Sequence, residues 1–171
     1  MANTEQLKTV VEPELADLFL KGHTAQRLRP GRVLGMDCDL IAYSESDHIL
    51  WFCEITTSGF LGKGDKDFHV GAVRKFCEGF AKFSLVRYHE SQVRQIIRAK
   101  APSIISTGLR CRFVVPKGSR FIRALGWRKQ LLDMGIMDLE ELELSPSSQA
   151  LTEAILLQAR GEQATAAVAA R

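Results

Sequence analysis

The chain has 171 residues, of which 46% are hydrophobic; this is enough for one domain with its own core and too few for two. No apolar run is long enough to span a membrane, and the charged residues among the first twenty exclude a secretory signal, so a cytoplasmic protein without a membrane partner is expected. The net charge is +3, and the four cysteines form no CxxC pair, which argues against a zinc or redox motif.

The first element is an amphipathic helix from Thr4 to Lys21. Its apolar residues recur at intervals of three and four, as one buried helix face requires. Pro13 removes one helical hydrogen bond, which predicts either a kink or a fresh start with Pro13 in the first turn. Gly22 is the expected stop.

Three apolar runs then predict three strands: Arg32 to Met36, Leu40 to Tyr43, and Ile49 to Thr57. The polar segment from Ser44 to His48 separates the second run from the third and has the composition of a hairpin turn. These two strands are therefore expected to be antiparallel neighbours.

The second half of the chain predicts helices and further strands. The pattern from Val70 to about Arg98 is helical, with a break near Tyr88 to Ser91. The remaining predicted elements are strand residues at Ile104 to Ile105 and Arg110 to Pro116, a short basic helix from Phe121 to Met134, and a strand or helical turn from Met137 to Leu144.

This order of elements indicates an α/β fold with a mixed central β-sheet flanked by helices. Residues 1–144 are predicted to form a single domain. Residues 145–171 are rich in Ser, Ala and Gln, and we expect a peripheral helix or a partly disordered tail there.

Two carboxylates mark one end of the predicted hairpin. Asp39 opens the first strand, and Glu54 lies near the end of the second, within a run that is otherwise apolar. With the turn centred near Ser46, the two acids fall level across strands about 4.8 Å apart. Such a pair can bind one hard divalent cation, which would also relieve the cost of burying Glu54.

Asp39 with the strand that follows it, and Glu54-Ile55-Thr56 after the turn, resemble the PD-(D/E)xK nuclease superfamily. The resemblance covers roughly residues 10 to 90 and implies a restriction-endonuclease-like fold. It implies that Mg2+ or Mn2+ is held by Asp39, Glu54 and the backbone carbonyl of Ile55. It also implies a helical glutamate that reaches the metal, for which Glu12 is the first choice and Glu14 the second.

Thr56 stands where the superfamily has the lysine that positions the attacking water and stabilises charge on the phosphate. In some members this lysine has moved to a neighbouring position. Lys75 is the first candidate for that role here, followed by Lys63 and Lys66. His69 is a candidate base, and Asp37 a supporting acid.

The segment from Arg87 to Lys129 carries eleven Lys or Arg residues and one acid, Glu90, whereas an acidic cluster lies near Glu140. This polarity favours an anionic partner. Trp51 and Trp127 are interpreted as packing residues. The residues expected to contact phosphates are Lys117, Arg120, Arg123, Arg128 and Lys129.

These features predict a nuclease, an endo- or exonuclease dependent on Mg2+ or Mn2+, with Asp39, Glu54, Lys75 and Glu12 as catalytic residues and DNA preferred over RNA. The alternative is a catalytically degenerate nuclease-like module that binds nucleic acid or a protein partner without turnover. A third hypothesis is a protein-interaction module with structural carboxylates. The acidic cluster beside the basic helix also permits a homodimer.

Overall fold

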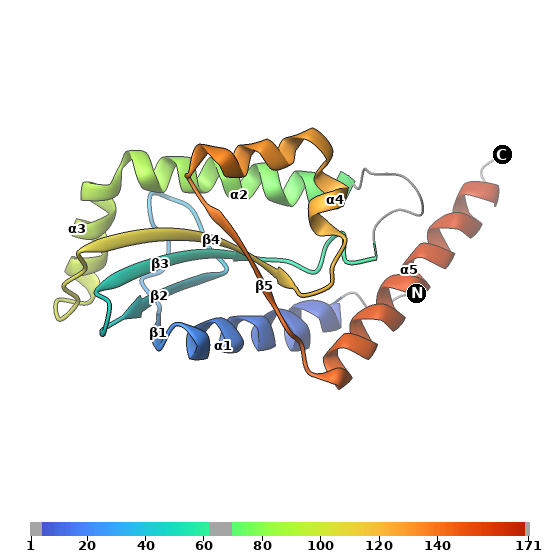
Figure 1. Cartoon of the computed structure of the whole chain (residues 1–171), viewed down its shortest axis with the longest axis horizontal. Helices are drawn as coiled ribbons and strands as arrows, with labels where there is room; N and C mark the ends of the chain where they lie inside the picture. Colours follow the sequence, from blue (N-terminus) through green and yellow to red (C-terminus); the bar gives the residue numbers. More distant parts are fainter. Residues whose placement is uncertain (1–4, 62–69, 170–171) are drawn as a thin grey trace.

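The computed structural model describes residues 5–61 and 70–169, with side chains to residue 159. Its centre is a mixed sheet of five strands in the order β1-β2-β3-β4-β5 (Figure 1). β2 runs antiparallel to both β1 and β3, whereas β4 runs parallel to β3, and β5 parallel to β4. The strands are β1 (Ala25–Leu28), β2 (Leu40–Ser44), β3 (Ile49–Ile55), β4 (Gly108–Pro116) and β5 (Asp138–Leu142).

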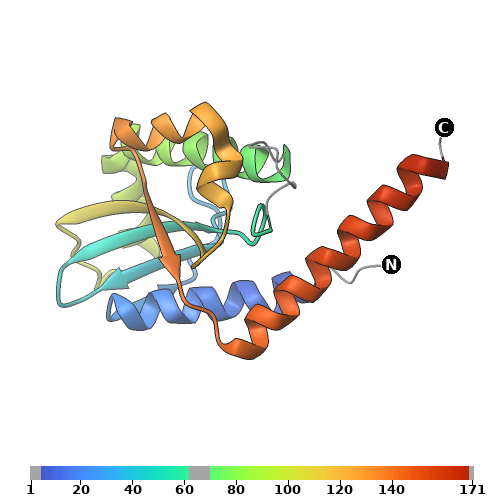
Figure 2. The ribbon, with the colours of Figure 1, turned by 45° about the vertical axis from the view of Figure 1, so that its right-hand side comes forward.

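Helices cover both faces of the sheet (Figure 1). A π-helical turn, η1, runs directly into α1 on one face, and α2 and the 3-10 helix η2 lie on the other. The last helix, α5, starts near α1 and projects away from the sheet (Figure 2). The helices are η1 (Leu7–Val11), α1 (Glu12–Gly22), α2 (Val70–Tyr88), α3 (Glu90–Lys100), α4 (Phe121–Leu125), η2 (Gly126–Met134) and α5 (Pro146–Ala169).

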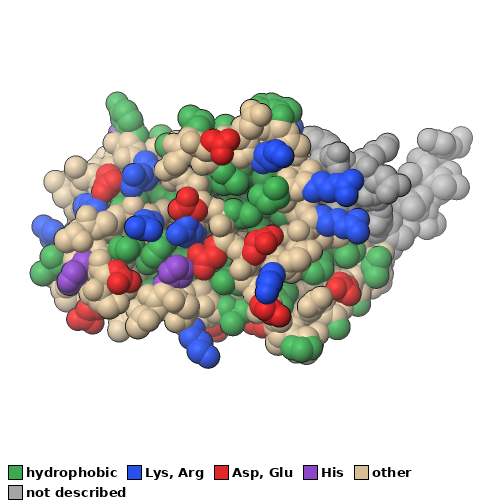
Figure 3. Space-filling view, in the orientation of Figure 1, with side chains coloured by type: hydrophobic (Ala, Val, Ile, Leu, Met, Phe, Trp, Pro, Cys, Tyr) green, Lys and Arg blue, Asp and Glu red, His purple; other side chains and the backbone are tan. Residues whose placement is uncertain are grey.

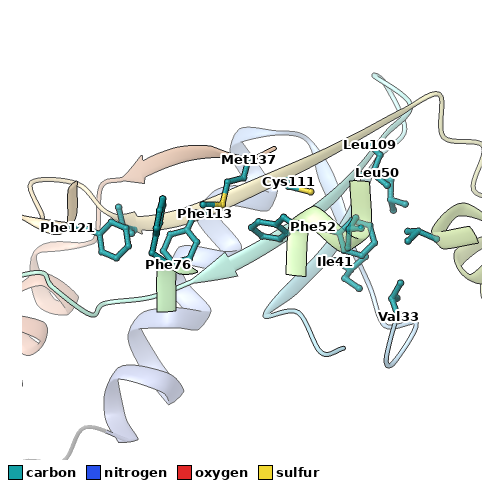
Figure 4. Close-up of a cluster of buried hydrophobic side chains, with 14 of the residues drawn as sticks. Val33, Ile41, Leu50, Phe52, Phe76, Leu109, Cys111, Phe113, Phe121 and Met137 are labelled. Atoms are coloured by element: carbon teal, nitrogen blue, oxygen red, sulfur yellow. The ribbon is translucent and has the colours of Figure 1, made fainter. Parts of the chain in front are cut away.

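The sheet divides the interior into two apolar clusters. Along β3, Phe52 belongs to the cluster under α2, whereas Trp51 and Cys53 belong to the cluster under α1. Because both faces are covered, β3 is a nearly continuous apolar run, and the buried Glu54 interrupts it. Under α2, the ring of Phe113 is stacked on Phe121, with 5.1 Å between ring centroids (Figure 4).

Several sequence predictions are confirmed. The mixed α/β architecture is the expected one, and Pro13 lies in the first turn of α1. β2 and β3 form the predicted antiparallel hairpin. The helical region breaks at His89, between α2 and α3, and the last predicted strand is β5.

Two predicted strands are wrong, and one strand was not predicted. Val33 and Met36 form only an isolated bridge, because Leu34 and Gly35 both adopt positive φ angles, of 53° and 76°, and turn the chain back. Ile104 and Ile105 lie in a loop. The strand that completes the meander is β1, which pairs with β2 and was not predicted.

The start of α5 is fixed to α1 by Glu14. One carboxylate oxygen accepts the backbone N–H of Ser145 at 2.6 Å, and the other accepts the hydroxyl groups of Ser145 and Ser148. Burial alone would raise the pKa of Glu14, but these hydrogen bonds outweigh it and lower the pKa. The predicted peripheral helix is thus present, while the domain boundary at residue 144 stays a prediction.

All four cysteines are free thiols, and Cys53 and Cys111 are buried in strands. Cys38 lies outside the strands, just before β2. Burial raises the pKa of both Cys38 and Cys111 to about 12, which keeps these thiols protonated and unreactive. Across the described residues, no helix is both long and apolar enough to cross a membrane.

Candidate functional site

The hairpin brings Asp39 and Glu54 to the same end of the sheet. Leu40, the first residue of β2, pairs with Cys53 of β3, so the next residues outward are Asp39 and Glu54, as predicted. An oxygen of Asp39 accepts the backbone N–H of Ile55 at 2.8 Å. This hydrogen bond fixes the Asp39 carboxylate across the strand end and holds the Ile55 peptide in place.

Glu54 is a buried carboxylate with a lysine partner. Its side chain is 3% exposed, and its Oε1 accepts a hydrogen bond from Lys82 Nζ at 2.9 Å. Burial and the nearby charge of Asp39 raise the pKa of Glu54, while Lys82 and Lys75 oppose that rise. The carboxylate therefore lies among an acid and two cations.

Glu12 brings a third carboxylate from the start of α1. Its pKa is raised to about 7, first by burial and then by the charge of Asp39, and Lys75 and Lys8 act in the opposite direction. Glu12 and Asp39 are therefore close enough to interact electrostatically. Glu14, the second choice from the sequence, points instead to the start of α5.

The α2 helix approaches the acids closely because Gly79 has no side chain. A Cβ atom at this position would lie 2.9 Å from the ring of Phe113 and 3.5 Å from Cγ of Glu54. Lys75 and Lys82 flank Gly79 at four and three residues, which places all three on one face of the helix. Close approach of the helix backbone is what lets Lys82 reach Glu54.

Lys82 is the site residue that sequence reasoning missed. From the sequence, the first candidate is Lys75, which lies on the same helix. A signal was present, because Lys75, Glu78, Gly79 and Lys82 form a polar stripe at helical spacing among apolar residues. Within that stripe, the carboxylate of Glu78 lies 3.6 Å from Nζ of Lys82.

The position of the motif lysine offers no cation. Thr56 is buried, its N–H donates to the carbonyl of Val114, and its hydroxyl accepts the N–H of Ser58 at 3.0 Å. Lys63, Lys66 and His69, the other candidates from the sequence, lie outside the described residues. Asp37, the predicted supporting acid, is exposed, and its carboxylate lies 3.0 Å from Nε of Arg32.

The described residues contain no group of three or more His, Cys, Asp or Glu side chains arranged to hold a metal ion. The donor chemistry at Asp39 and Glu54 does fit a hard cation, because two carboxylates and the Ile55 carbonyl are all oxygen ligands. The buried carboxylate of Glu54, whose pKa is raised by burial and by the charge of Asp39, is also a group whose charged form a cation stabilises. The residues present thus suit a two-carboxylate site.

Several cations of the basic segment make contacts within the fold. The guanidinium of Arg87 donates to the carbonyl of Leu109, and that of Arg94 to the carbonyl of Ser106. Arg112 pairs with Asp138 and Glu140 on the adjacent strand β5. Acidic and basic side chains accordingly alternate on the face that carries β5 (Figure 3).

The acidic cluster has partners within the chain as well. Glu140 accepts hydrogen bonds from His23 Nε2 at 2.9 Å, and Glu143 lies 3.1 Å from Lys117. The charge asymmetry on which the predicted self-association rested is therefore compensated internally. A homodimer stays a prediction without support from this cluster.

The five residues predicted to contact phosphates follow the C-terminal end of β4 and lie in the turn and the two helices that come after it. Lys117 and Arg120 line a cleft of about 320 Å³. Arg123 is on α4, and Arg128 and Lys129 are on η2. Trp51 is buried as predicted, but the packing role predicted for Trp127 is wrong, since 66% of this residue is exposed.

Comparison with protein-family models, with curated proteins and with solved structures finds no match to this chain. Its function has to be argued from the side chains of the site.

Proposed function

We propose that this chain is a divalent-metal-dependent phosphodiester hydrolase acting on nucleic acid, with a restriction-endonuclease-like fold. One observation carries the proposal. Asp39 and Glu54 lie at one end of the β2–β3 hairpin, Glu12 is near enough to Asp39 for their charges to interact, and Lys82 donates a hydrogen bond to the buried Glu54. A buried carboxylate whose pKa is raised beside specific charged partners is typical of functional sites.

The arrangement of elements supports the fold part of the proposal. An acid opens one strand of a hairpin, and its partner strand carries the glutamate level with it, as the resemblance to the PD-(D/E)xK superfamily requires. The helix that follows the hairpin packs against the same strand end and supplies the lysines Lys75 and Lys82.

The oxygen ligands of the proposed Mg2+ or Mn2+ ion are the carboxylates of Asp39 and Glu54 and the carbonyl of Ile55, with Glu12 as a further acid. The bound cation would supply Lewis-acid chemistry and lower the pKa of a water molecule. Asp39 orients the Ile55 peptide through its hydrogen bond to the N–H.

Lys82 takes the part of the missing motif lysine in this proposal. Its ammonium group lies 2.9 Å from the Glu54 carboxylate, and 20% of the Lys82 side chain is exposed. A cation placed there stabilises the charge that develops on a phosphate. Lys75 is the second cation of the same helix face.

The test is cleavage of labelled single- and double-stranded DNA and RNA with Mg2+ or Mn2+. Asp39→Asn and Glu54→Gln should each abolish cleavage, and Lys82→Met should lower its rate by a factor of 100 or more, roughly the loss of one charge-stabilising group. Asp37→Asn is the matched control, because Asp37 is two residues from Asp39 but is exposed and bonded to Arg32. Cleavage that survives Asp39→Asn and Glu54→Gln contradicts the proposal.

The second candidate is a nuclease-like module that binds without turnover. Two observations favour it. Lys82 already donates a hydrogen bond to Glu54, and a buried threonine, Thr56, stands where the superfamily has its lysine. This candidate predicts nucleic-acid binding without cleavage in either metal. It also predicts that neither Mg2+ nor Mn2+ raises the melting temperature.

A further inference from the structure

The α4–η2 surface, which we define as the exposed side chains from Lys117 to Met134, is the part of the basic segment that remains positive. Within this stretch the sequence has five cations and a single acid, Asp133. By contrast, Arg87, Arg94 and Arg112 are bound to carbonyls or acids elsewhere. The stretch from Lys117 to Met134 therefore carries a local excess of positive charge.

Trp127 is the aromatic side chain of this surface. Gly126, at a positive φ of 59°, turns the chain between α4 and η2, and Trp127 follows at the corner with 66% of its surface exposed. The guanidinium carbon of Arg128 lies 4.8 Å from the centroid of the ring. An exposed ring among cations is the combination with which proteins bind unpaired bases and their phosphates.

The α4–η2 surface is joined directly to the end of the sheet that carries the acids. The turn after β3 reaches Phe60, whose carbonyl accepts the N–H of Arg120 at 3.0 Å. Gly59 lies against Phe121, where an added Cβ would be 3.5 Å from the ring. The cleft lined by Lys117 and Arg120 therefore lies between the turn after β3, the turn that leads from β4 into α4, and α5, from which Gln149, Glu153 and Leu157 also line it.

The ion pair of Lys117 does not close this cleft to an anion. Lys117 and Glu143 are 3.1 Å apart, and both side chains are mostly exposed. Exposed pairs of this kind contribute little to stability, so a phosphate can replace Glu143 as the partner of Lys117.

We propose that the α4–η2 surface binds single-stranded nucleic acid, with Trp127 stacked on an unpaired base and Lys117 and Arg120 contacting phosphates. A base must be unpaired to present its full face to an exposed ring, which is why a single strand is preferred over a duplex. This inference rests on the proposed function in one respect: the bound single strand is a substrate only if the protein is a nuclease.

The test is a fluorescence titration in EDTA, so that cleavage plays no part. Trp127 is exposed and Trp51 is buried, so quenching by a single-stranded oligonucleotide reports on Trp127. The Trp127→Phe variant keeps an aromatic ring, and any quenching that it still shows comes from Trp51. Single-stranded DNA and RNA and a DNA duplex are titrated in parallel.

Trp127→Ala should weaken binding of the single strand roughly 5- to 150-fold, whereas Trp127→Phe should retain most of it. Ile105→Ala is the matched control, because Ile105 is 65% exposed, lies outside the α4–η2 surface and cannot stack, and the affinity of this variant should equal that of the wild type. Absence of quenching, equal affinity of Trp127→Ala and wild type, or tighter binding of the duplex would overturn the inference. If Asp39→Asn binds but does not cleave, the surface is supported independently of the proposed chemistry.

Discussion

Replacement of Lys82 by Met tests whether the buried charge of Glu54 depends on its lysine. Met keeps most of the aliphatic stem of Lys82 and removes only the ammonium group, so the packing of α2 is preserved. The Glu54 carboxylate, 3% exposed, then loses its hydrogen-bond donor at 2.9 Å. It retains only the more distant attraction of Lys75.

The size of the effect has an upper limit set by protonation. Removing one member of a buried ion pair costs about 3 to 5 kcal/mol. Glu54 can escape this cost by taking up a proton, which at pH 7 costs about 3.4 kcal/mol for a carboxyl whose ordinary pKa is 4.5. At pH 5 the same proton costs only about 0.7 kcal/mol. Lys82→Met should therefore lower the free energy of unfolding by up to about 3 kcal/mol at pH 7 and by less than about 1 kcal/mol at pH 5.

The assay is urea unfolding at both pH values, with thermal melts as a second measurement. A loss of 3 kcal/mol corresponds to a fall of roughly 6 to 12 °C in melting temperature for a chain of this size. The double variant Glu54→Gln with Lys82→Met should recover most of the loss at pH 7, because no buried charge remains. Lys75→Met is the control and should cost about 1 kcal/mol or less. A Lys82→Met protein within about 0.5 kcal/mol of wild type at pH 7, or equally destabilised at both pH values, would refute the reasoning.

Two further predictions concern the elements that surround this pair. Gly79→Ala should destabilise the protein by about 1 to 2 kcal/mol, because the new Cβ meets the buried ring of Phe113 at 2.9 Å and this outweighs the gain in helix propensity. Gly22→Ala, where nothing lies within 4 Å, should be neutral or slightly stabilising; equal effects in urea unfolding would contradict the close approach of α2. Burial and Asp39 raise the pKa of Glu12 to about 7, so the stability that its protonated form contributes is complete below pH 4.5 and is lost as the pH rises through 7. Glu12→Gln should therefore gain stability relative to wild type over that window, on the order of 1 kcal/mol after allowance for partial exposure, and parallel stability curves would contradict this.

The regular elements could be predicted where periodicity and turn chemistry agreed. The β2–β3 hairpin was predictable because two apolar runs flank a polar turn, and its register then fixed the positions of Asp39 and Glu54. β1 could not be predicted, because its four residues are half-buried or exposed and form a strand only by pairing with β2. A strand was wrongly predicted near Leu34 because the apolar side chains there favour a strand, and the leucine side chain gives no sign that Leu34 adopts a positive φ.

The candidate site was predictable in its acids but not in its cations. Carboxylates within or beside apolar runs stand out in a sequence, whereas a lysine on an amphipathic helix resembles any solvated residue. Lys82 acquires its role only because Gly79 brings α2 against β3. The pairing of Arg112 could not be predicted for a related reason: its partners Asp138 and Glu140 lie on β5, which is distant in sequence and adjacent in space.

The charged strand β5 has a consequence for how copies of this protein meet one another. It is one of the two outer strands of the sheet, where unpaired backbone groups invite another strand to add and start aggregation. Three of its five residues, Asp138, Glu140 and Glu141, are acids. A second copy of the strand that approached this border would bring like charges together, which opposes continuation of the sheet from one molecule into the next.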